Sequence, residues 1–303
     1  MPHRIAIAAA AVVACATALA PVPAAAQSSP DWLLPRTRHF TAPIADPMEP
    51  RFAIGLIATD LLKSRGPERP AFVIEDSADA AFDVQATAAV GGTLPLFRLA
   101  RWSNGGIVVG GQVGAFARFR IENPSRDDLG ADWFVSMPIE LAAGPWSGRV
   151  EIGHRSSHLG DEFLLYTGAE RIEFGSEFVD GLAAWSLYDI VRVYGGGTWI
   201  FRSNTAWEMR QRGLGEHDRF QLQAGADGEW LLGGVARAYG GVDVQAAERS
   251  DWRTQIAAVA GVGVSANGRA IRLLARFHDG VSSLGEFFLT DERSFAIELE
   301  ILP

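Results

Sequence analysis

The sequence predicts an all-β protein, a single antiparallel up-and-down transmembrane β-barrel of about twelve strands. Apolar and polar residues alternate with a period of two in segments of roughly ten residues, and turn residues separate these segments. The 303-residue chain is 48% hydrophobic with 33 glycines, yet it offers no apolar helix of spanning length after its N-terminus. Short and longer connections also alternate along the chain, as they do in single-chain barrels.

The first 26 residues have the pattern of a secretory signal peptide. Residues 1–4 are basic, residues 5–20 form a short apolar run, and Ala24-Ala25-Ala26 supplies a cleavage site with small residues. Cleavage after Ala26 would remove the only cysteine and leave a mature protein without disulfides. In the alternative interpretation, Cys15 is the lipidated residue of a lipoprotein. We expect residues 27–50 to form a periplasmic segment and residues 51–303 to form the barrel.

The alternation is clearest between residues 132 and 142, where apolar and polar side chains point to opposite faces. The apolar face consists of Trp133, Val135, Met137, Ile139 and Leu141. Comparable patterns in the other segments predict strands near 51–59, 82–92, 107–121, 132–142, 146–156, 170–178, 182–202, 219–229, 234–246, 252–264, 269–279 and 293–302. These segments make an even number of strands, as bacterial barrels require.

The connections between the predicted strands fall into two classes. The tight connections are residues 143–145, 180–181 and 265–268, and the longer ones are 60–81, 122–131, 157–169, 203–218 and 280–292. Residues 93–106 are long for an inner turn and could contain further strand, and the chain ends without the terminal aromatic residue of many barrels. A soluble sandwich or a lipocalin-like barrel is the alternative fold.

Charged residues crowd the face of the strands that should point into the barrel. We expect the following side chains to line the lumen: Arg118, Arg120, Glu140, Arg149, Glu151, Arg171 and Glu173. Because a barrel of this size encloses little free space, such charges should pair and fill it. A narrow pore is the alternative. The net charge of −9 argues against nucleic acid as a partner, since phosphate binding needs a basic patch.

The densest concentration of chemically reactive side chains is at residues 154–162, with the sequence HRSSHLGDE. His154 and Ser156 continue the lipid-facing side of their strand, and a nucleophilic serine needs a nearby base. Glu170 begins the next predicted strand and would lie across the hairpin from Ser156. In that position it could orient His154 as the third member of a catalytic triad does.

Two stretches of this sequence resemble an uncharacterised family of bacterial exported proteins, catalogued as domain of unknown function 1207. They are Ala45 to Phe52 (ADPMEPRF) and His154 to Glu162. The resemblance implies an outer-membrane location but no activity.

The pair His154-x-Ser156 also resembles the sites of outer-membrane phospholipase A and of lipid A deacylases. That resemblance implies His154 as the base, Ser156 as the nucleophile, Glu170 as the orienting residue, and an outer-membrane lipid or lipopolysaccharide as the substrate. Ser157 and His158 depart from the phospholipase pattern, which has Asn-Gly after the serine.

Two other hypotheses for the motif stay open. Ser157, His158, Gly160, Asp161 and Glu162 could simply fix the end of the strand and its loop through hydrogen bonds. Alternatively, the histidines and acids could bind a metal, with oxygen ligands suiting calcium and imidazoles a transition metal. The sequence implies no cofactor, with calcium as the alternative. We also expect the barrel-assembly machinery to be a partner, as for other outer-membrane barrels.

Overall fold

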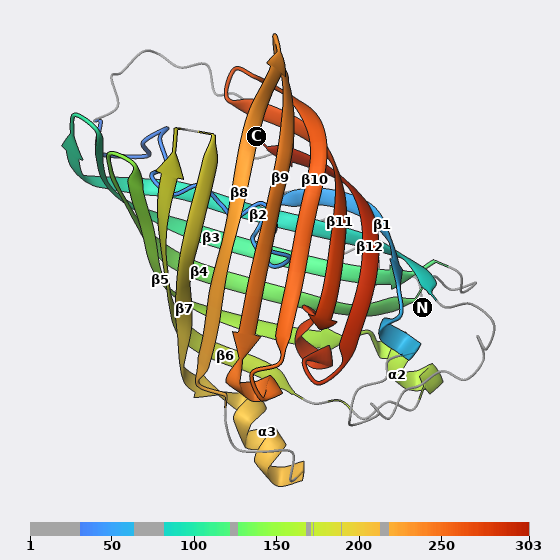
Figure 1. Ribbon diagram of the computed structural model, residues 1–303. Helices are drawn as coiled ribbons and strands as arrows, with labels where there is room; N and C mark the ends of the chain where they lie inside the picture. The colour runs from blue at the N-terminus through green and yellow to red at the C-terminus, as the bar shows by residue number, and fades with distance from the viewer. Residues whose placement is uncertain are drawn as a thin grey trace, which may run out of the picture.

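The protein forms a closed barrel of twelve antiparallel strands (Figure 1). The computed structural model describes residues 31–63, 82–121, 127–167, 171, 173–188, 190–212 and 218–302. The predicted signal peptide, including Cys15, lies outside these residues. Among the described residues, no helix is both long and apolar enough to cross a membrane.

Each strand pairs with its neighbours in the sequence, and β1 closes the barrel by pairing with β12 from Phe52↔Ile301 to Thr59↔Ser294. The strands are β1 Phe52–Thr59, β2 Asp83–Trp102, β3 Gly105–Arg120, β4 Asp128–Ala143, β5 Trp146–Leu159, β6 Phe174–Leu187, β7 Val191–Ser203, β8 Phe220–Gly233, β9 Ala236–Ala247, β10 Thr254–Ala266, β11 Arg269–Val281 and β12 Asp291–Leu302. The helical elements are η1 Leu61–Lys63, α2 Asp161–Thr167, α3 Asn204–Arg212, η2 Glu248–Ser250 and η3 Gly285–Phe287.

The two ends of the barrel differ, which confirms the predicted alternation of connections. Tight turns join β2 to β3, β4 to β5, β6 to β7, β8 to β9 and β10 to β11 at one end. The chain also enters β1 and leaves β12 at this end (Figure 1). The opposite end carries the long connections with α2, α3, η2 and η3. We refer to these as the tight-turn end and the long-loop end.

Several strand boundaries differ from the prediction, most of all in β2 and at the turn between β6 and β7. β2 continues to Trp102 and pairs with β3 over its whole length, with register irregularities after Pro95 and Arg98. The segment 93–106 is therefore mostly strand. Asp180 and Gly181, which resemble a turn in sequence, lie in the middle of β6, where the Asp180 carboxylate accepts a hydrogen bond from Thr198 Oγ1 at 2.7 Å. The turn comes later, where Ile190 N donates to Leu187 O at 3.1 Å.

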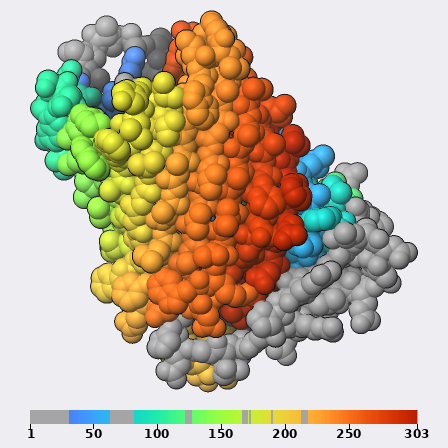
Figure 2. Space-filling view, in the orientation of Figure 1, coloured from blue at the N-terminus to red at the C-terminus, as the bar shows by residue number. Residues whose placement is uncertain are grey.

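The outer wall of the barrel is apolar and continuous. Side chains such as Ile54, Leu99 and Met137 are exposed by 58–65% on this surface. In Figure 2, the strands from yellow to red form an unbroken wall on the visible side. An apolar outer band with polar residues inside is the pattern of outer-membrane barrels, because lipid surrounds the outer face and polar groups fill the lumen.

The N-terminal segment, residues 31–51, enters the barrel and crosses its lumen. The buried residues Phe40 and Ala45 and the partly buried Met48 pack in three separate clusters against different parts of the wall. We expected residues 27–50 to lie in the periplasm. Residues 38–50 lie inside the barrel instead. Their side chains show no strand periodicity, and the lumen offers them both apolar surface and ion-pair partners.

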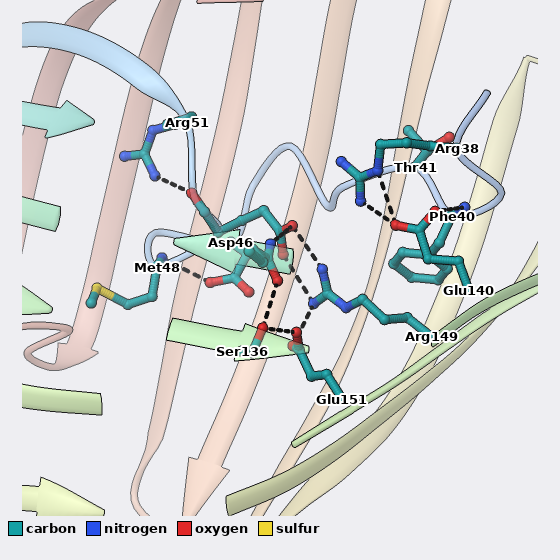
Figure 3. A network of polar contacts seen from close by, with 12 residues as sticks. Arg38, Phe40, Thr41, Asp46, Met48, Arg51, Ser136, Glu140, Arg149 and Glu151 are labelled. Carbon is teal, nitrogen blue, oxygen red and sulfur yellow. Dashed lines mark hydrogen bonds and ion pairs between the residues drawn. The ribbon is translucent and has the colours of Figure 1, made fainter. Parts of the chain in front are cut away.

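Ion pairs and hydrogen bonds fix the N-terminal segment to the wall (Figure 3). Glu140 of β4 accepts hydrogen bonds from the Arg38 guanidinium at 2.6 and 2.9 Å, and also from the backbone amide of Phe40. Arg149 of β5 donates to both carboxylate oxygens of Glu49, at 2.8 and 3.1 Å. Pairing of this kind compensates for removing the charges from water.

The predicted lumen charges divide into two groups. Arg118, Glu140, Arg149 and Glu151 are buried inside the barrel, and Arg118 pairs with Glu292 at 2.5 Å. Arg120 is the last residue of β3 and is partly exposed at the long-loop end. Arg171 and Glu173 do not lie on a strand, because β6 begins only at Phe174. They are exposed at the long-loop end.

Candidate active site

His154 and Ser156 lie on the outer face of β5, toward the long-loop end. The alternate residues Arg149 and Glu151 are buried in the lumen, whereas Ile152 is 53% exposed outside. Because side chains alternate along a strand, His154 and Ser156 follow Ile152 on the outer face. The His154 side chain is 46% exposed. The imidazole of His154 and the hydroxyl of Ser156 are therefore neighbours on one face of the strand.

A carboxylate from the next strand contacts this histidine. The His154 Nδ1 atom lies 3.5 Å from Oε1 of Glu177, its register partner on β6. The Arg202 Nη1 atom, from β7, lies 3.7 Å from the same oxygen. His154, Glu177 and Arg202 therefore form a polar row across three strands on an otherwise apolar surface. With Nδ1 turned toward Glu177, the Nε2 atom of His154 is left to act on another group.

The structure does not place the predicted third residue beside this row. Glu170 lies outside the described residues, and the register partner of Ser156 on β6 is Gly175. The connection contains the short helix α2, so that β6 starts four residues later than we expected. Among the described residues, Glu177 is the carboxylate that contacts His154.

Sequence reasoning missed Glu177 because it assigned the wrong face of β6 to lipid. The parity that would put Glu170 on the lipid face also puts Phe174 and Phe178 there, but these two side chains are 6% and 3% exposed and point into the barrel. Phe178 stacks on Phe134 with ring centroids 5.7 Å apart, and the Arg155 guanidinium lies 5.7 Å from its centroid. The inward turn of these aromatic rings places Glu177 outside. No pattern in the sequence signals this, because both faces of the strand carry apolar residues.

The second half of the motif anchors the connection between β11 and β12. Ser157 is buried, and its Oγ atom accepts a hydrogen bond from the Glu286 amide at 3.2 Å. Its register partner Asp132 accepts one from the Gly285 amide at 2.9 Å. His158 contacts Arg171, which in turn pairs with the Glu286 carboxylate at 2.8 Å. These contacts hold η3 in the mouth of the barrel.

The last three residues of the motif start α2. A side chain at Gly160 would place its Cβ atom 1.9 Å from the carbonyl oxygen of Asp128, so the close approach of the two backbones requires glycine. Asp161 and Glu162 occupy the first turn of α2, where carboxylates interact favourably with the helix dipole. Phe163 then packs on Phe287 of η3, with centroids 6.3 Å apart.

The metal-binding hypothesis has no support from this arrangement. In the part of the chain that the structure describes, no three His, Cys, Asp or Glu side chains converge as a metal site would require. His154 faces Glu177 on the outer wall, whereas His158 faces the cationic Arg171. Asp161 and Glu162 belong to α2. The four proposed ligands therefore have separate environments.

Comparison with known proteins identifies a family and a fold. The profile of the family described as "Protein of unknown function (DUF1207)" matches residues 75–299. No curated protein matches the chain significantly in sequence. Outer membrane phospholipase A from Escherichia coli has a similar structure, with a TM-score of 0.51 and 13% identity over 84% of this chain and 92% of that chain. The Salmonella typhi outer membrane phospholipase dimer with bound calcium gives 0.51 and 11%, over 85% and 93%. At these identities, the similarity concerns the fold.

Proposed function

We propose that this chain, which belongs to the DUF1207 family of proteins of unknown function, is an outer-membrane hydrolase that cleaves lipid acyl esters at Ser156. The contact between His154 and Glu177, beside Ser156 on the outer wall, carries this proposal. Ionisable side chains facing lipid are costly, so a row of three such residues on an apolar wall points to a function. The proposed substrates are phospholipids or lipopolysaccharide.

The position of the row suits a substrate that is held in a bilayer. Trp133, the register partner of Ser156 on β4, is 53% exposed on the same outer face. Amphipathic rings favour the boundary between the hydrocarbon and the headgroups. An ester bond of a membrane lipid lies at that depth, with its acyl chains along the apolar wall. We infer that the lipid reaches the serine without leaving the membrane.

In the proposed reaction, Ser156 Oγ attacks the ester carbonyl while His154 Nε2 accepts the hydroxyl proton. Glu177 fixes the orientation of the imidazole through Nδ1 and stabilises its cationic form. His154 then gives the proton to the leaving alcohol, and an acyl-serine remains. Water attacks this ester, His154 accepts a proton from the water, and the return of the proton to Ser156 releases the fatty acid.

No group of three His, Cys, Asp or Glu side chains that could hold a metal lies among the described residues, and the proposed steps use only the side chains of this chain. The bound calcium of the Salmonella typhi phospholipase nevertheless makes calcium a condition to vary. The outer-membrane location, export by a cleaved signal peptide and insertion by the barrel-assembly machinery are part of the same proposal. The outer-membrane type of the barrel supports them.

Mass spectrometry of lipid products tests the activity. Refolded wild-type protein would be incubated with mixed phospholipids and with lipopolysaccharide, with and without calcium. We expect the wild type to release fatty acid and Ser156→Ala to release none. Ser147→Ala, on the same strand at the tight-turn end, is the matched control and should retain full activity. Equal products from wild type and Ser156→Ala would overturn the assignment.

A non-catalytic structural barrel is the second candidate, and a specific observation favours it over a pore. The N-terminal segment crosses the lumen and is paired with the wall at Glu140 and Arg149. Conductance in a planar bilayer would separate the two. A structural barrel should stay closed, whereas a pore should conduct and respond to replacement of Arg118 or Glu140.

A further inference from the structure

Besides the outer face of β5, a cavity of about 120 Å³ inside the barrel has the features of a ligand site. It lies in the lumen toward the long-loop end. Its floor is formed by Asp46, Met48 and Glu49 of the N-terminal segment, and Leu284 and Phe288 of the β11–β12 connection line its outer side. At about 30 Å³ for each water, the space suits a ligand of a few heavy atoms.

Two arginines share one side of this cavity with a single carboxylate between them. The guanidinium groups of Arg155 and Arg249 lie 5.8 and 5.3 Å from the centroid of the same ring, that of Phe174. Both donate to Oε1 of Gln221, at 3.3 and 3.2 Å. Arg249 pairs with Asp218 at 3.2 Å, whereas Arg155 has no carboxylate within 4.0 Å among the described residues.

The acids that line the cavity are already engaged. Asp132 accepts the amide of Gly285 at 2.9 Å, and Asp180 accepts the hydroxyl of Thr198 at 2.7 Å. Glu151 accepts the hydroxyl of Ser136 at 2.7 Å, Asp46 accepts the amide of Gln223 at 3.0 Å, and Glu49 is paired with Arg149. Asp132, Asp180 and Asp218 act on Arg155 electrostatically, but none of them lies within ion-pair distance of its guanidinium group.

We propose that this cavity binds a small oxyanion, a carboxylate or a phosphate, between the guanidinium groups of Arg155 and Arg249. A cation held inside a protein without a directly paired carboxylate is costly, and Arg155 interacts with Asp132, Asp180 and Asp218 only from beyond ion-pair distance. Only the Nε and Nη2 atoms of Arg155 have hydrogen-bond partners among the described residues, and both partners are neutral oxygens. An oxyanion would supply the missing charge and accept the remaining N–H groups. Guanidinium groups match carboxylate and phosphate geometry through paired hydrogen bonds.

This cavity and the proposed hydrolytic site share β5 and meet at Ser156, which is among the residues that line the cavity. Arg155 lies between His154 and Ser156 in sequence, and alternation sends its side chain into the lumen while theirs face outward. This accounts for an arginine in the middle of the motif, which the proposed hydrolysis does not use. The two proposals can therefore fail independently.

Isothermal titration calorimetry of the refolded full-length protein tests the site, with inorganic phosphate and acetate as probes in a chloride buffer. We expect the wild type to bind at least one probe and Arg155→Gln to bind it about ten-fold more weakly or worse. Arg237→Gln is the matched control, since Arg237 pairs with Glu229 away from the cavity and should leave binding unchanged. His154→Ala should also bind normally, whatever its activity, because His154 faces outward and does not line the cavity.

Three results would overturn the proposal. The first is a wild-type protein that binds neither probe, and the second is binding that Arg155→Gln leaves intact. The third is an Arg155→Met variant that is less stable than the wild type when no oxyanion is present, as a purely structural role of Arg155 would require. We expect Arg155→Met to be at least as stable as the wild type under these conditions, because it removes a charge without an ion-pair partner. If Arg155→Gln does not fold, Arg249→Gln provides the same binding test.

Discussion

Replacing Glu49 by alanine should loosen the N-terminal segment while leaving the strand pairing intact. Glu49 and Arg149 form two hydrogen bonds, at 2.8 and 3.1 Å, and their side chains are only 6% and 5% exposed. Removing one partner of a buried ion pair costs about 3–5 kcal/mol, because the other charge stays buried. Glu151 remains 3.4 Å from Arg149, so we expect a loss near the lower end, about 3 kcal/mol.

The loss can be measured by urea unfolding in detergent micelles, followed by tryptophan fluorescence. Arg149→Met leaves both Glu49 and Glu151 without their cation, so it should cost at least as much as Glu49→Ala. The double variant should recover part of that loss, since the Glu49 charge is removed together with its partner. Asp31→Ala is the matched control. Asp31 is 73% exposed and pairs with Arg98 on the surface, where solvent screens the ion pair, so its removal should cost far less than that of Glu49. If Glu49→Ala lowered the free energy of unfolding no more than Asp31→Ala does, Glu49 would not be a buried anchor.

Three further predictions concern the motif and the connection it anchors. Ser157→Ala should lower the free energy of unfolding by about 1–3 kcal/mol, because it leaves the Glu286 amide without its acceptor. Hydrogen exchange of backbone amides should become faster at η3 but not in β4, and unchanged exchange would contradict the anchoring role. Glu177→Gln should lower kcat for fatty-acid release, with little change in KM. Glu173 is exposed just before β6, so the control Glu173→Gln should leave kcat unchanged. Equal kcat values for the two variants would remove Glu177 from the mechanism. Burial raises the pKa of Glu286 from 4.5 to about 7, so the folded protein holds this proton where the unfolded chain has lost it. The contribution of Glu286 to stability should therefore be fully present below about pH 4.5 and be lost as the pH rises toward 7, and Glu286→Gln should remove this contribution from the profile in urea titrations.

The architecture was predictable because one-sided burial leaves a strong trace in sequence. Residues 132–142 alternate cleanly, since lipid surrounds one face and the polar lumen the other. The tight turns at Gly144 and at Asn267-Gly268 were also recognisable, because these residues adopt positive φ angles of 59°, 55° and 77°. Local sequence was sufficient where local geometry decides the structure.

The missed features depend on contacts between distant parts of the chain. Asp180 and Gly181 have turn chemistry, but pairing with β5 and β7 on both sides keeps them in a strand. The N-terminal segment has no strand pattern, and its place in the lumen follows from partners about 100 residues away, such as Arg149 for Glu49.

In the candidate site, His154 and Ser156 follow from the periodicity of their own strand. Their acidic neighbour depends on which face of β6 turns inward, and interior packing of Phe178 on Phe134 decides this. Sequence parity alone therefore gave Glu170 as the expected partner, whereas the structure brings Glu177 to His154.

We propose Ser156 as a nucleophile that His154 activates. Labelling with a fluorophosphonate probe, followed by peptide mapping, tests this most directly, because such probes react covalently with activated serines. We expect a single adduct on Ser156 in the wild type and much weaker labelling of Ser156 in His154→Ala, with Ser147 unlabelled in both. An unlabelled Ser156 in folded wild-type protein, or labelling that His154→Ala leaves unchanged, would contradict this proposal.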